Sequence, residues 1–118
     1  MRQTCVDGFE RIRKASDEFF ARHGYVREGT KYRIERPNQD RIALFCHQGF
    51  SMEFLPILLQ IPPQYTLGNF DFTHSAVSIF EFRNNQDGYT QPKCLCLSDI
   101  SHIYEARLPL VYNNGILL

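Results

Sequence analysis

The residues best placed to do chemistry in this sequence are His47, Gln48 and Gly49. They lie between an apolar run, RIALFC at 41–46, and an apolar helical pattern at 50–60. The run is typical of a strand covered on both faces, so the stretch predicts a βα unit with His47 at the carboxyl end of the strand. Open α/β sheets bind ligands at this position, and the N–H groups that begin the helix favour an anion such as phosphate.

The same stretch resembles a known family. The similar segments are FCHQGF at 45–50, LLQIPP at 58–63, FDFTHSAVS at 70–78 and LSDISH at 97–102. Together they resemble the histidine phosphatase superfamily, the broad group that contains the phosphoglycerate mutases. The similarity extends from about Asp7 to Asn114, but it corresponds only to the C-terminal half of that family's domain.

The resemblance implies a phosphoryl-transfer site in which His47 matches the family's second His. That residue helps to hold the phosphoryl group and stabilises its charge during transfer. We therefore expect His47 as the catalytic residue and His47, Gln48 and Gly49 as the phosphate-binding residues. Gln48 stands where the family commonly has Gly, so its side chain narrows the phosphate seat, while Gly49 leaves the turn some freedom.

The resemblance also implies what is missing. The family forms its phosphohistidine on an N-terminal Arg-His-Gly motif, and a second Arg and an acidic proton donor complete the pocket. These groups belong to the half that this sequence does not match. Loss of a nucleophile typically costs on the order of 10⁴–10⁶ in rate. We therefore expect a phosphomonoesterase-like chain with negligible activity alone.

Arg22-His23-Gly24 repeats the letters of that nucleophile motif, but its setting differs. It ends an amphipathic pattern in which Val6, Phe9, Ile12, Ser16, Phe19, Phe20 and His23 share one helical face. A glycine after the last apolar residue is typical of a helix C-terminus, where Arg22 and His23 are favoured by the helix dipole. We interpret the triplet as the end of a first helix that packs its Phe side chains on a sheet.

The remaining pattern predicts a small α/β domain spanning residues 1–118. Alternation around Gly29-Thr30 predicts a hairpin whose basic side chains (Arg27, Lys31, Arg33 and Arg36) face solvent, and residues 76–82 and 93–97 predict two further strands. With the 41–46 strand they would form a small mixed sheet in a partial three-layer α/β/α sandwich, phosphoglycerate mutase-like by resemblance. Ser98-Asp99 could cap a short helix that holds His102, and packing or capping explains His74 and His102 more simply than chemistry.

Composition excludes some functions. Thirteen basic and thirteen acidic residues cancel, so the sequence does not favour nucleic acid or an anionic membrane as partner. It contains no signal-peptide core and no long apolar span, which favours a cytoplasmic protein. No cofactor is expected.

The four cysteines, Cys5, Cys46, Cys94 and Cys96, have no C-x-x-C spacing. They are interpreted as reduced, mostly buried thiols. A zinc site made of Cys46, His47 and the Cys94/Cys96 pair is the disfavoured alternative.

Two other functions remain open at this stage. A half sheet has open edges and uncovered apolar faces, so the chain could be a non-catalytic module that binds a partner or forms a homodimer, for instance by exchanging its first helix. Alternatively, a separate polypeptide could provide the N-terminal half and complete a split phosphatase.

Overall fold

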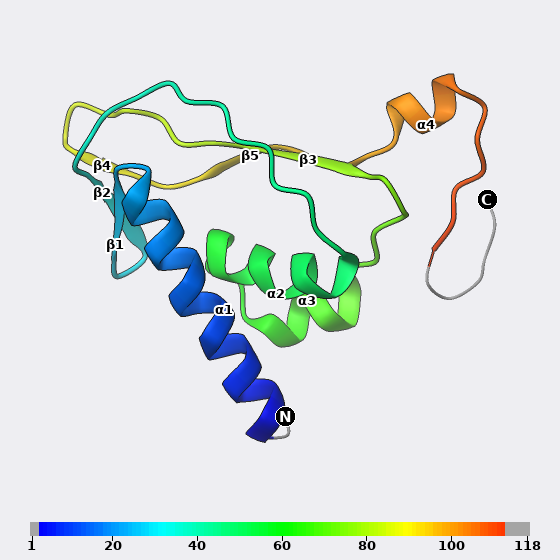
Figure 1. Cartoon of the computed structure of the whole chain (residues 1–118), viewed down its shortest axis with the longest axis horizontal. Coiled ribbons are helices and arrows are strands. Elements are labelled where there is room, and N and C mark those ends of the chain that lie inside the picture. Colours follow the sequence, from blue (N-terminus) through cyan, green and yellow to red (C-terminus); the bar gives the residue numbers. More distant parts are fainter. Residues whose placement is uncertain (1–2, 113–118) are drawn as a thin grey trace.

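The computed structural model describes residues 3–112, with side-chain burial from residue 6 onward. Its elements in chain order are α1 (Gln3–Arg22), β1 (Tyr25–Glu28), β2 (Lys31–Ile34), α2 (Gln48–Leu59), α3 (Pro63–Asn69), β3 (Val77–Glu81), β4 (Tyr89–Thr90), β5 (Lys93–Asp99) and α4 (Ser101–Glu105). Figure 1 shows their arrangement. The mixed α/β class is confirmed.

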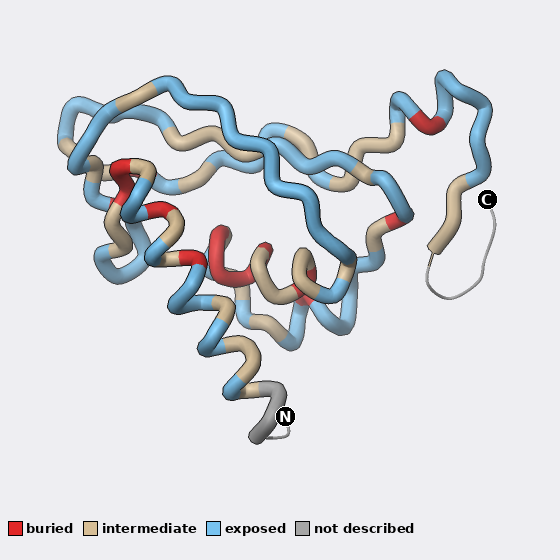
Figure 2. The backbone as a smooth tube through the Cα atoms, in the orientation of Figure 1, coloured by how far each residue is buried: buried red, intermediate tan, exposed pale blue. Residues whose placement is uncertain are grey.

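The core forms where α1 meets the hairpin and α2. Its buried members are Phe20, Tyr25, Tyr32 and Leu58. The ring of Phe20 lies 5.5 Å from that of Tyr32 and 5.1 Å from that of Phe82, in edge-on and tilted geometries that favour aromatic pairs. Figure 2 shows buried residues concentrated along α1, the first hairpin and α2. The first helix therefore packs its Phe side chains on a sheet, as the sequence predicts.

The predicted hairpin is also present. β1 and β2 pair antiparallel, with Tyr25 opposite Ile34 and Glu28 opposite Lys31. Gly29 has a φ of +65° in the intervening turn, a conformation that glycine adopts without strain. β4 adds to β2, which gives a three-stranded sheet in the order β1-β2-β4.

The strands predicted at 76–82 and 93–97 are β3 and β5. They pair antiparallel with each other, with Ile79 opposite Cys96 and Phe80 opposite Cys94, and an irregularity in register lies between these two pairs. They form a separate two-stranded sheet, which we call the β3–β5 ribbon. The strands of the described residues thus form two antiparallel sheets, whereas the sequence predicted one mixed sheet.

The strand predicted at 41–46 is wrong. Residues 37–47 are extended chain without strand pairing, and residues 41–47 are all exposed; Figure 2 shows this stretch as a long exposed trace between β2 and α2. Phe45 is 92% exposed. The apolar pattern identified a segment able to form a buried strand, but a strand also needs a neighbour to satisfy its backbone groups. Among the described residues, β2 is paired on both sides and β3 pairs only with β5.

Three smaller features differ from the prediction. The helix predicted at 50–60 begins at Gln48 and continues through Pro56 to Leu59. α3 was not predicted; Pro63 occupies its first position, where a proline costs no hydrogen bond. α4 is present and contains His102, but its N-cap is Ile100 and no side chain caps it, so the capping role of Ser98 and Asp99 is wrong.

Candidate functional site

His47 lies at the N-terminus of α2. It is the N-cap residue, with extended backbone angles (φ −93°, ψ 163°), and its side chain is exposed and makes no capping hydrogen bond. Its carbonyl oxygen accepts a hydrogen bond from the N–H of Ser51 at 3.1 Å, the bond that opens the helix. No acidic residue lies in the first turn. His47 is thus an exposed residue directly before the first N–H groups of a twelve-residue helix, which have no partner within the helix.

The next two residues differ in their surroundings. The side-chain amide of Gln48 donates a hydrogen bond to Oδ1 of Asp71, which lies in the loop after α3. Gly49 lies within α2, and a Cβ placed there would meet no atom within 4 Å. Gly49 has no positive φ. Its conformational freedom, expected from the sequence, is therefore not used in this turn.

The Arg-His-Gly triplet lies elsewhere. α1 ends at Arg22, and Gly24 adopts a φ of +96° while its N–H donates to the carbonyl of Ala21 at 3.0 Å. The ring of His23 packs against that of Phe19 at 4.7 Å. In Figure 1, α1 ends beside β1, whereas α2 begins at the other end of the helical layer. The interpretation of the triplet as a helix C-terminus is confirmed.

Two surface hollows lie away from His47. One, of about 350 Å³, lies between α1, the hairpin turn and the end of α2, and its lining includes Arg13, Arg27 and Gln60. The other, of about 320 Å³, lies beside α4, and its lining includes His74 and His102. His47 lines neither hollow. The residues predicted for phosphate binding therefore lie outside both of these hollows, and His47 and Gly49 are exposed.

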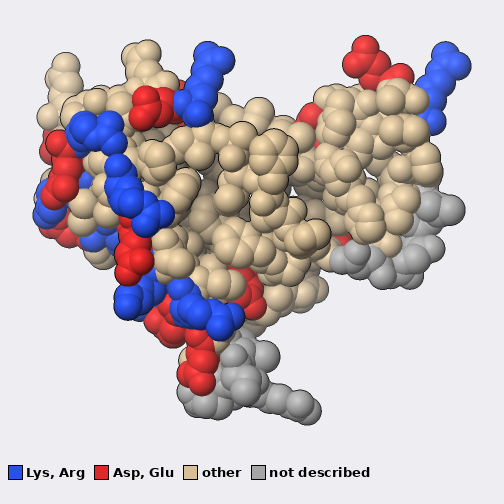
Figure 3. Space-filling model, in the orientation of Figure 1, with Lys and Arg blue, Asp and Glu red and all other residues tan. Residues whose placement is uncertain are grey.

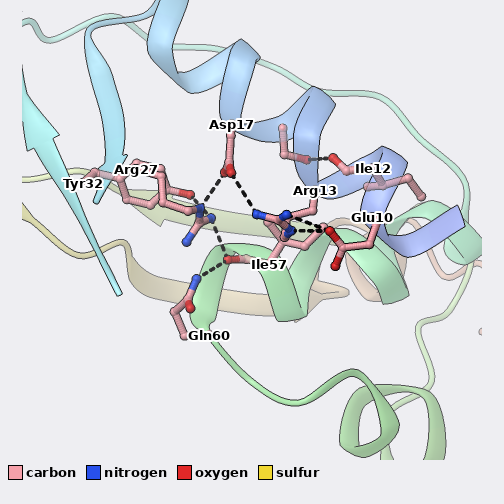
Figure 4. Close-up of polar contacts among 9 residues, drawn as sticks. Glu10, Ile12, Arg13, Asp17, Arg27, Tyr32, Ile57 and Gln60 are labelled. Carbon is pink, nitrogen blue, oxygen red and sulfur yellow. Dashed lines mark hydrogen bonds and ion pairs between the residues drawn. The ribbon is translucent and has the colours of Figure 1, made fainter. Parts of the chain in front are cut away.

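Arg27 is the residue whose burial was predicted wrongly from the sequence. It was predicted to face solvent, but its side chain is only 12% exposed. Figure 4 shows it between three elements: Nε contacts Oδ1 of Asp17 at 2.5 Å, and Nη2 donates to the hydroxyl of Tyr32 at 2.5 Å and to the carbonyl of Ile57 at 3.0 Å. Burial raises the pKa of Tyr32 to about 12. The cluster joins α1, the hairpin and α2, so its role is structural.

The cysteines are free but not buried as predicted. Cys46 and Cys94 are exposed, and Cys96 is partly exposed; Cys5 lies where side chains are not described. Among the described residues, no group of three or more His, Cys, Asp or Glu side chains could hold a metal ion. The alternative zinc site is therefore not assembled in this structure.

Comparisons with family models, with curated proteins and with solved structures find no match to this chain. In the part of the chain that is described, no helix is both long and apolar enough to cross a membrane.

Proposed function

We propose that this chain is a histidine-phosphatase-type half domain that retains a phosphate-holding site at the start of α2. The observation that carries the proposal is the position of His47, an exposed imidazole at the open N-terminus of a twelve-residue helix with no acidic residue in its first turn. Such a terminus attracts anions through unpaired N–H groups and the positive end of the helix dipole.

In this site the phosphate oxygens accept hydrogen bonds from the backbone N–H groups of Gln48 and Gly49, and the His47 ring donates a further one. The neighbouring Asp71 carboxylate opposes anion binding, and its hydrogen bond to Gln48 draws that side chain away from the ligand. The site is open to water, which weakens every electrostatic contact. We therefore expect weak binding of inorganic phosphate or a phosphomonoester.

The chain supplies a phosphate holder, but the described residues place no activated nucleophile beside it. The one Arg-His pair that resembles a nucleophile motif closes α1, and its His ring is packed on Phe19. Without a group that accepts the phosphoryl unit, a positioned phosphomonoester has no partner for transfer. The isolated chain should accordingly bind phosphate without turnover.

The proposal includes a fold for the complete site, a phosphoglycerate mutase-like three-layer sandwich of which this chain provides a part. In that arrangement another polypeptide segment covers residues 41–46, which are exposed and have no strand partner among the described residues. The apolar character of this exposed stretch supports the idea, because Ile42, Leu44 and Phe45 gain from burial only when something covers them.

The test is an assay of the isolated chain with a generic aryl phosphate, together with His47→Ala and His23→Ala. We expect no turnover above the uncatalysed rate for any of the three. Robust turnover that His47→Ala abolishes would show a complete active site and overturn the proposal of a half domain. Turnover lost only in His23→Ala would instead assign the chemistry to the end of α1.

A further inference from the structure

The molecule exposes more surface than its size requires. Its accessible surface is 8454 Å², whereas a folded monomer of 13.8 kDa exposes about 6,600 Å². Its radius of gyration is 15.7 Å and its extents are 45 × 39 × 19 Å, against about 13 Å for the radius of a compact domain of this length. The excess of roughly 1,800 Å² is about twice what one partner buries in an interface of standard size.

Part of this surface is an unpaired segment between β2 and α2. Residues 41–46 are extended and exposed, and among the described residues no backbone hydrogen bond joins them to another segment. Ile42 and Leu44 are half exposed, and Phe45 is almost fully exposed. Unpaired backbone groups on an apolar, extended segment are a template for strand pairing.

Another part is a sheet with free edges. The β3–β5 ribbon has only two strands, so each strand has one unpaired edge among the described residues. Val77, Ile79, Leu95 and Leu97 of this ribbon are exposed. A two-stranded sheet is marginal in water, and a third strand with an apolar face stabilises it.

Both parts are poor in charge. Residues 42–46 and the stretches 77–80 and 94–98 contain no Lys, Arg, Asp or Glu. Figure 3 shows most charged side chains over α1, β1 and β2 and a smaller group at the α4 end, while the middle of the face in view is largely uncharged. With no net charge, two copies have no long-range repulsion to overcome when these surfaces meet.

We propose that the occupant of this surface is a second copy of the chain, with residues 41–46 of each copy added as a strand to the β3–β5 ribbon of the other. The unpaired segment and the free sheet edge are on the same molecule, so a dimer with one twofold axis would pair both at once and close the assembly. Strand addition pairs the backbone groups, and the apolar side chains give the contact its buried area. The inference does not depend on phosphate binding at His47.

The first test is sedimentation equilibrium of the full chain at about 1–100 µM, the range in which weak interfaces of standard size dissociate. We expect a monomer–dimer equilibrium. Phe45→Asp introduces a charge at an exposed position, and Ala43→Pro removes a backbone donor. Each should raise the dissociation constant at least tenfold while the far-ultraviolet circular dichroism stays that of the parent. Tyr104→Asp, at an 81% exposed position on α4, is the matched control and should dimerise like the parent.

A second readout locates the contact. Cys94 and Cys96 lie on β5 and are accessible in the monomer, so their reaction with a thiol reagent should slow several-fold as the chain concentration rises, and Phe45→Asp should remove that protection. A parent chain that is monomeric throughout the range would overturn the inference. So would a dimer that Phe45→Asp and Ala43→Pro leave as tight as the parent, because another surface would then hold it.

Discussion

The amide of Gln48 donates a hydrogen bond to the carboxylate of Asp71, so the residue directly after His47 is tied to an acidic group. The pairing places a negative charge beside the helix N-terminus that we propose for phosphate. It satisfies the Gln48 donor in the free protein, and it competes with an anionic ligand for the same positive region.

Removing that charge should strengthen anion binding. In Asp71→Asn we expect the dissociation constant for inorganic phosphate to fall about two- to fivefold, because a charge at a helix terminus is worth roughly 0.3–1 kcal/mol. Calorimetry or phosphorus NMR at low ionic strength measures it. Glu18→Gln, an equally conservative change on an exposed position of α1, is the control and should leave the affinity unchanged. Equal affinities for the parent and Asp71→Asn would place the bound anion elsewhere.

Arg27 should matter for stability far more than an exposed arginine. Arg27→Met leaves Asp17 without its close partner and opens the junction between α1, the hairpin and α2. We expect a loss of about 3 kcal/mol in the free energy of unfolding. Arg33→Met removes surface pairs with Glu28 and Glu35, which solvent screens, and should leave the free energy of unfolding nearly unchanged. Urea denaturation compares the two, and equal losses would contradict the structural role of Arg27.

Stability should fall at high pH. Burial raises the pKa of Tyr32 to about 12 from an ordinary value of 10.0, so the unfolded chain releases this proton first. The contribution of Tyr32 to the free energy of unfolding is fully present below about pH 10 and is lost as the pH rises to about 12. Its full size is about 2–3 kcal/mol. Tyr32→Phe should flatten this part of the profile, whereas Tyr104→Phe, on an exposed tyrosine, should not. An unchanged slope in Tyr32→Phe would assign the alkaline loss to other groups.

Two glycines of the first helical region should respond in opposite directions to alanine. A Cβ at Gly24 would lie 2.5 Å from the carbonyl oxygen of Arg36, and the φ there is +96°, so Gly24→Ala should destabilise the fold by more than about 1 kcal/mol. Gly8 lies inside α1 with open space around it, and Gly8→Ala should stabilise by about 0.5–1 kcal/mol. Thermal unfolding of both variants checks the pair. If Gly24→Ala leaves the stability unchanged, the result would argue against a left-handed residue at position 24 after the end of α1.

The sequence predicted which helices and strands form better than it predicted which of them pair or pack together. The helical Phe pattern, the turn at Gly29 and the β3 and β5 alternation depend on local periodicity, and each is present. The strand at 41–46 depends on a neighbouring strand that periodicity does not reveal, and this stretch is exposed.

The same limit applies to the candidate site. The existence of α2 just after His47 followed from local pattern, although α2 begins at Gln48 and not at residue 50. The long-range partners did not: the contact of Gln48 with Asp71 spans two helices, and that of Arg27 with Ile57 joins a strand to α2. Arg27 lies between Val26 and Glu28 in a hairpin whose basic and acidic residues are interleaved, and such a pattern is typical of a solvated face. The alternation of Val26 and Arg27 places them on opposite faces of the strand, but it does not tell which of the two faces is buried.

The most direct test of the phosphate site is a titration of the isotope-labelled chain with inorganic phosphate, followed by amide and imidazole NMR. We expect saturable shifts of the Gln48 and Gly49 amides and of the His47 ring, with a dissociation constant of about 1 mM or weaker, and His47→Ala should weaken the binding several-fold. Titration with chloride at matched ionic strength controls for screening. Shifts confined to the surroundings of Arg13, His74 or His102, with the start of α2 unaffected, would contradict a phosphate-holding role for His47.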